Sequence, residues 1–130
     1  MKKRVFKVPV IGDVEVTLVQ VEGKEDEESV MKILKRVKYD DKAGIDYIRD
    51  NIKNENYDGG DTLYCMNIRK IVVVFFIFTC EEEREAVYGH EKRHIEDRIL
   101  KYFSIDDIET NALLAGFLSK EFYKFKKNKL

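Results

Sequence analysis

Hydrophobic and polar residues alternate along the first part of the chain. The alternation covers residues 4–11 (RVFKVPVI) and 15–22 (EVTLVQVE), with Gly12 and Asp13 between them. Alternation of this length is typical of a half-buried β-strand, and a glycine-containing turn between two such runs predicts a β-hairpin. Pro9 cannot donate to a strand ladder, so we expect it at an edge or a bulge.

The pattern then changes to helical spacing, which predicts one helix from Ser29 and a second, shorter helix from Asp41. The apolar positions that carry this spacing are Val30, Ile33, Leu34 and Val37 in the first helix and Ile45, Ile48 and Ile52 in the second. An acidic run, residues 22–29, leads into the first helix and is expected to be a solvated loop.

A second pair of strands is expected after a polar loop. Residues 54–62 (NENYDGGDT) carry two glycines among Asn and Asp, which predicts a loop. Residues 63–67 and 71–79 then read as a second hairpin. The run 71–78 (IVVVFFIF) is apolar at every position, as expected for a central strand covered on both faces, and it is too short to cross a bilayer as a helix.

Helical spacing resumes from about residue 82 to 103 and again from 105 to about 125. Ser104, with Asp107 three residues later, is the predicted N-cap of the last helix. The predicted fold class is therefore α+β: a small, mainly antiparallel sheet with packed helices. The length of 130 residues fits a single domain, residues 1–130.

Charge and cysteine content narrow the possible partners and location. Charged residues make up 38% of the chain but leave a net charge of −1, so we expect neither a nucleic-acid nor a membrane partner. Lys7, Asp13 and Glu15 interrupt any continuous apolar segment of a signal peptide. Cys65 and Cys80 follow no CxxC spacing and are expected to be free, buried thiols in a reducing cytoplasm.

The two histidines of the chain lie in the stretch VYGHEKRHIEDRIL, residues 87–100. In a helix, His90 and His94 share one face and can direct two imidazoles at one metal ion. Glu91 lies about 100° further round, where it can act as a general base beside the metal. The alternative is that both histidines lie on a charged helix surface without a metal.

The order of a strand, a helix with His90, Glu91 and His94 in the pattern His-Glu-x-x-His, and a further helix resembles the zincin metallopeptidases. The resemblance covers about residues 71–125. It implies a Zn²⁺ ion held by His90 and His94. In the glutamate branch of this group, the gluzincins, the next helix supplies a third ligand, for which Glu109 is the candidate; Asp106 and Asp107 are the alternatives. The stretch DDIETNALLAGFL is also similar to small proteins with this motif encoded by bacterial phages and mobile elements.

The resemblance implies a zinc-dependent peptidase that hydrolyses a peptide or protein substrate, with Glu91 as the catalytic base. A different class remains open: a metal-binding or metal-free interaction module that keeps the helix pair without turnover. Lys92 and Arg93 favour this alternative, because the zincins usually have uncharged residues at these two positions.

Overall fold

The computed structural model describes residues 1–9 and 11–127 of the chain. Its strands are β1 (Lys2–Lys7), β2 (Glu15–Gln20), β3 (Gly60–Cys65) and β4 (Lys70–Phe75). Its α-helices are α1 (Glu27–Arg36), α2 (Lys42–Lys53), α3 (Glu81–Tyr102) and α4 (Ile108–Lys127). Val10 of the first predicted strand and residues 128–130 of the predicted domain lie outside the described residues.

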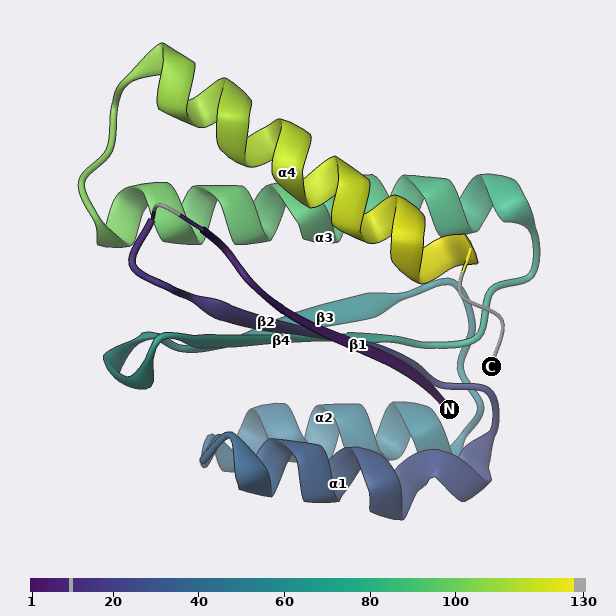
Figure 1. Cartoon of the computed structure of the whole chain (residues 1–130). Coiled ribbons are helices and arrows are strands. Elements are labelled where there is room, and N and C mark those ends of the chain that lie inside the picture. Colours follow the sequence, from purple (N-terminus) through teal and green to yellow (C-terminus); the bar gives the residue numbers. More distant parts are fainter. Residues whose placement is uncertain (10, 128–130) are drawn as a thin grey trace.

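The four strands form one sheet, which is the middle of three layers: α1 and α2 cover one face, and α3 and α4 cover the other (Figure 1). The strand order is β1-β2-β4-β3. The pairs β1/β2 and β3/β4 are antiparallel, and β2/β4 is parallel. The predicted α+β class with a mainly antiparallel sheet is thus confirmed.

Strand β4 occupies a central position because its side chains are apolar on both faces. Val73 and Phe75 belong to the core under α3 and α4, whereas Val72 and Val74 belong to the core over α1 and α2. All four side chains are at most 2% exposed. Each face of the sheet therefore has its own hydrophobic core, and α3 is fixed to the sheet by one of them.

Both predicted hairpins are confirmed, but the strand ends differ from the prediction. Strand β1 covers Lys2–Lys7 rather than residues 4–11, and β2 ends at Gln20 rather than at residue 22. Strand β3 begins at Gly60, so the last three residues of the predicted loop 54–62 are strand. Strand β4 ends at Phe75 rather than at residue 79. Pro9 follows the edge strand β1, and its carbonyl accepts a hydrogen bond from the N–H of Ile11 (2.8 Å).

The prediction that Ser104 caps the last helix is wrong. Helix α4 begins at Ile108, and Ser104 has a φ of +55°, outside the helix. Asp107 is the capping residue instead: its Oδ2 accepts hydrogen bonds from the Thr110 N–H (2.8 Å) and the Thr110 hydroxyl (2.7 Å). These two bonds lower the pKa of the Asp107 carboxyl.

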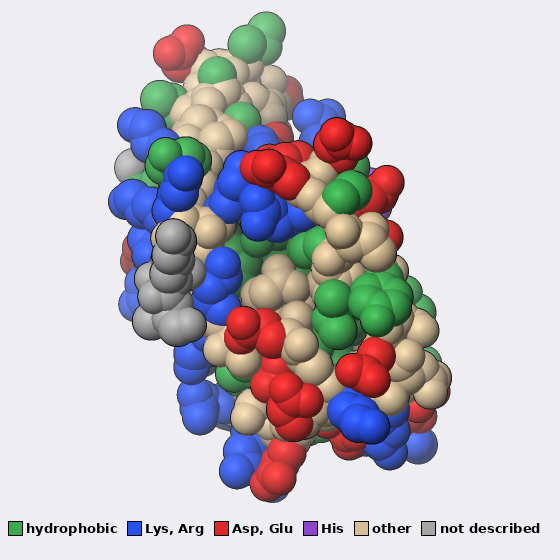
Figure 2. Space-filling model, turned by 90° about the vertical axis from the view of Figure 1, so that its right-hand side faces the viewer, with side chains coloured by type: hydrophobic (Ala, Val, Ile, Leu, Met, Phe, Trp, Pro, Cys, Tyr) green, Lys and Arg blue, Asp and Glu red, His purple; other side chains and the backbone are tan. Residues whose placement is uncertain are grey.

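The cysteines are free, as expected, but they are not buried: Cys65 is half-buried and Cys80 is exposed. Acidic and basic side chains both occur on the face of the molecule shown in Figure 2, around a hollow with hydrophobic side chains. None of the helices in the described part of the chain combines the length and the apolar character needed to cross a membrane.

Candidate metal and active site

Helix α3 positions the His-Glu-x-x-His residues by its packing on the sheet. Tyr88, Ile95 and Ile99 are buried in the core that the helix shares with β4. This register leaves His90 and His94 exposed, one turn apart, and buries Glu91 between them and the sheet. The apolar residues of α3 thus determine which way the polar ones point.

The two imidazoles lie close enough to share a metal ion. The Nε2 atoms of His90 and His94 are 3.0 Å apart, and the ring planes are nearly perpendicular, at 87°. Two nitrogens bound to one zinc at the usual bond length and a tetrahedral angle lie about 3.3 Å apart. The pair therefore fits a zinc ion with only a small adjustment.

Glu91 is held beside the pair by the edge strand β3. Its side chain is buried, with the residue 4% exposed, and its Oε2 accepts a hydrogen bond from the Thr62 hydroxyl (2.6 Å). A Cβ atom at Gly60 would lie 3.3 Å from Glu91 Cγ, so the glycine lets β3 approach closely. One nitrogen from each histidine and one carboxylate oxygen of Glu91 lie within 4.8 Å of one another.

These residues line an open cavity of about 370 Å³ between α3 and β3. The lining residues are Gly60, Asp61, Thr62, Tyr64, His90, Glu91, His94 and Arg98. The Tyr64 hydroxyl lies 3.5 Å from the His94 carbonyl oxygen, and the Arg98 guanidinium carbon lies 4.0 Å from the centre of the Tyr64 ring.

Burial and charge shift the acidity of two of the lining groups. Burial raises the pKa of Asp61, and the nearby Glu91 carboxylate raises it further. Burial also raises the pKa of Tyr64, although Arg98 opposes the shift. Tyr64 therefore carries its proton at neutral pH, and in this structure its hydroxyl donates a long hydrogen bond to the His94 carbonyl oxygen.

Glu109, the predicted third ligand, is exposed in the first turn of α4 and is not part of the group formed by His90, Glu91 and His94. A carboxylate on α4 could reach the histidines only if small residues let α4 approach α3 closely, but the small residues one and two turns after Glu109 make no such contact. Ala112 and Gly116 are exposed, and a Cβ atom at Gly116 would meet no atom within 4 Å. The assignment of Glu109 stays a prediction: α3 and α4 do pack together, as at Tyr88 and Phe122, but not through Ala112 and Gly116.

The two aspartates that competed with Glu109 are exposed as well. The carboxylate of Asp107 is engaged in capping α4. Within residues 1–9 and 11–127, the potential ligand side chains that come together are therefore His90, His94 and Glu91.

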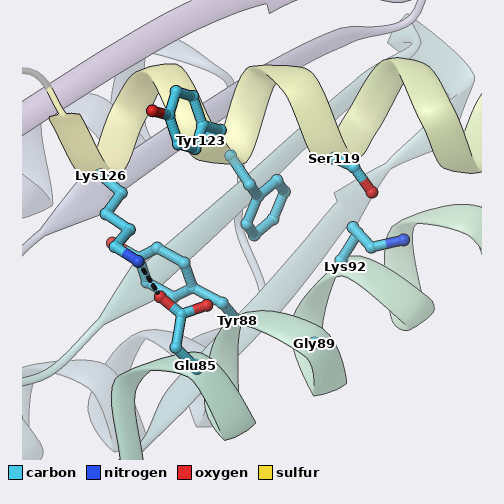
Figure 3. Close-up of a pocket in the computed structure, with 8 residues that line it drawn as sticks. Glu85, Tyr88, Gly89, Lys92, Ser119, Tyr123 and Lys126 are labelled. Carbon is cyan, nitrogen blue, oxygen red and sulfur yellow. Dashed lines mark ion pairs between the residues drawn. The ribbon is translucent and has the colours of Figure 1, made fainter. Parts of the chain in front are cut away.

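A second cavity, of about 260 Å³, lies between α3 and α4 and is lined by Tyr88 and Tyr123 among others (Figure 3). An ion pair between Lys126 and Glu85 (2.5 Å) spans it. Neither histidine lines this cavity. Tyr64, in contrast, lines the same cavity as the histidines and is the tyrosine placed to assist chemistry there, although sequence patterns did not single it out.

Comparison of the chain with protein-family models, with curated proteins and with solved structures gave no match in any of the three. What the site can do therefore has to follow from its own geometry. Thr62 and Tyr64 carried no signal in the sequence. Arg98 did: it follows His94 by four residues, so helical spacing alone places it on the histidine face.

Proposed function

We propose that this protein is a zinc-dependent metallopeptidase with His90 and His94 as metal ligands and Glu91 as general base. The observation that carries the proposal is the pair of Nε2 atoms 3.0 Å apart on an exposed helix face, next to a buried carboxylate. Exposed histidines are accessible to a metal from solvent, whereas a buried carboxylate is costly unless it has a structural or chemical role.

Zinc bound at this pair would supply Lewis acidity, which activates a water molecule and polarises a carbonyl group. Glu91 would accept the proton of that water and return it to the leaving amine. The Thr62 hydroxyl occupies Oε2 of Glu91 and leaves Oε1 for this transfer. The Tyr64 hydroxyl would have to turn from the His94 carbonyl oxygen, which it contacts at 3.5 Å, to donate a hydrogen bond to negative charge on the substrate carbonyl oxygen.

The edge of β3 supports a peptide as the substrate class. In the described residues β3 pairs only with β4, so its other edge is free beside the cavity. An extended peptide can add to such an edge through main-chain hydrogen bonds. Pairing there would bring peptide carbonyl groups next to the histidines.

A non-catalytic metal-binding module is the second candidate. The observation that favours it is that, among the described residues, Glu91 is the one side chain that joins the two histidines as a possible metal ligand, and the proposed peptidase needs Glu91 as its base. For either candidate we propose a reducing cytoplasm as the location, which the two free cysteines support.

The replacement Glu91→Gln tests the proposed chemistry, because the amide keeps the shape and can still accept from Thr62 but cannot take up the proton. With equal zinc content, we expect cleavage of a mixed peptide library to fall by about 10²–10⁴-fold relative to the wild type. Mass spectrometry of the products measures the loss, and Glu82→Gln, an exposed position on the same helix, is the control.

A Glu91→Gln variant as active as the wild type excludes this mechanism. No cleavage by a wild-type protein that holds stoichiometric zinc favours the metal-binding module instead.

A further inference from the structure

Arg98 extends the histidine face of α3 by one turn. His90, His94 and Arg98 follow one another at intervals of four residues and line the same cavity. The other two cationic residues near the motif are engaged elsewhere: Lys92 pairs with Glu96 (2.5 Å) and Arg93 pairs with Asp97 (3.3 Å). Among the described residues, Arg98 forms no ion pair, and its guanidinium stacks on the Tyr64 ring.

The stacking on Tyr64 orients the guanidinium without neutralising its charge. A guanidinium offers a planar fork of donors that matches the two oxygens of a carboxylate. The tyrosine ring holds this fork at the edge of the cavity, so less side-chain freedom is lost when an anion binds. The arrangement is suited to a carboxylate that reaches the cavity from outside.

The distance from the histidines sets where that carboxylate lies on a peptide. The metal would lie between the two histidines, and Arg98 is about 6 Å along the helix from His94 and about 12 Å from His90. An extended peptide advances about 3.3 Å per residue, so the distance of about 9 Å from the middle of the histidine pair spans about two to three peptide residues.

We propose that Arg98 binds a substrate carboxylate about two to three residues from the bond that is cleaved, an inference that rests on the proposed peptidase function. A substrate carboxylate is disfavoured at the opposite end of the cavity, because the carboxyl groups of Asp61 and Glu91 already lie there. The cavity therefore has an anion-binding end at Arg98 and an acidic end at Asp61.

The direction of the peptide relative to β3 decides on which side of the bond this carboxylate lies. Thr62 contacts Glu91, and Tyr64, further along the strand, contacts Arg98. A peptide that pairs antiparallel to β3 passes Arg98 before it reaches the histidines. The carboxylate is then the side chain of Asp or Glu on the N-terminal side of the bond, whereas a free C-terminal carboxylate reaches Arg98 only in parallel pairing.

Binding to the zinc-loaded Glu91→Gln protein tests the proposal without relying on turnover. The probes are fluorescent six-residue peptides with Glu or Gln at each position, each made with a free and an amidated C-terminus. By fluorescence anisotropy we expect Glu on the N-terminal side to strengthen binding about tenfold over Gln. Adding Arg98→Gln should remove this preference, and Arg98→Glu should shift it to peptides with Lys.

Arg93→Gln is the matched control, since Arg93 lies on the same helix outside the cavity and should leave the preference unchanged. The melting temperature of each variant shows whether weaker peptide binding comes from the lost charge or from a fold destabilised by the lost contact with Tyr64. An Arg98-dependent preference for a free C-terminus supports the carboxylate site with a peptide running parallel to β3.

A preference that survives Arg98→Gln at unchanged zinc content overturns the carboxylate site and leaves the proposed function standing. If instead the wild-type protein holds no zinc, the proposed function fails and the inference fails with it.

Discussion

The Thr62 hydroxyl is the partner that makes a buried carboxylate at Glu91 tolerable. The hydrogen bond joins residues 29 positions apart and connects β3 to α3. A carboxylate oxygen that is removed from water and left without a donor costs more than the hydrogen bond itself contributes. Thr62 therefore supports both the stability of the fold and the orientation of Glu91.

The replacement Thr62→Val keeps the shape of the side chain and removes this donor. We expect the free energy of unfolding to fall by about 1–3 kcal/mol, as for other unsatisfied buried groups. Urea denaturation measures the change. Thr62→Ser, which keeps the hydroxyl, should lose much less, and an equal loss in both variants would show that the methyl group rather than the hydrogen bond matters.

At the scale of single residues, the sequence was informative only where one element holds all the partners. His90, Glu91 and His94 lie on one helix, so their spacing predicts their proximity. The contacts of Glu91 with Thr62 and of Arg98 with Tyr64 cross from α3 to β3, and no local pattern encodes them.

At the scale of elements, the start of α4 depends on Asp107. Replacing Asp107 with Ala should lower the melting temperature, because two hydrogen bonds to Thr110 at the helix N-terminus are lost. Ser104→Ala is the control and should change it much less. An equal effect of both variants would contradict the assignment of the cap.

The same cap has a defined pH dependence. The pKa of Asp107 is lowered in the folded protein from its ordinary value of 3.8. The Asp107 carboxylate therefore stabilises the fold fully above pH 3.8, and this stabilisation is lost as the pH falls through the pKa of the folded state. The difference between the wild type and Asp107→Ala should shrink over that acidic range.

Helix α1 was predictable from its hydrophobic periodicity, and the central place of β4 was predictable from an apolar run without polar interruptions. The start of β3 was not, because Gly60 and Asp61 have low strand propensity and resemble loop residues. Pairing with the central strand overrides this preference: Gly60 lies opposite Phe75, and Asp61 lies opposite Val74. The start of α4 was missed because Ser104 and Asp107 both resemble caps.

At the scale of the whole molecule, the sheet separates two hydrophobic cores, and neither core includes the histidines. His90 and His94 are exposed, so their replacement by Ala removes no core contact. The protein should therefore fold without metal. A loss of metal in these variants would then report on coordination rather than on unfolding.

The zinc content of the purified protein tests the proposed metal site most directly. Elemental analysis after dialysis should give about one zinc per chain for the wild type and for Glu91→Gln. It should give almost none for His90→Ala or His94→Ala, because each of these variants keeps only one of the two histidine ligands. Circular dichroism confirms that each variant remains folded. Equal, negligible zinc in the wild type and in both histidine variants would contradict the metal site.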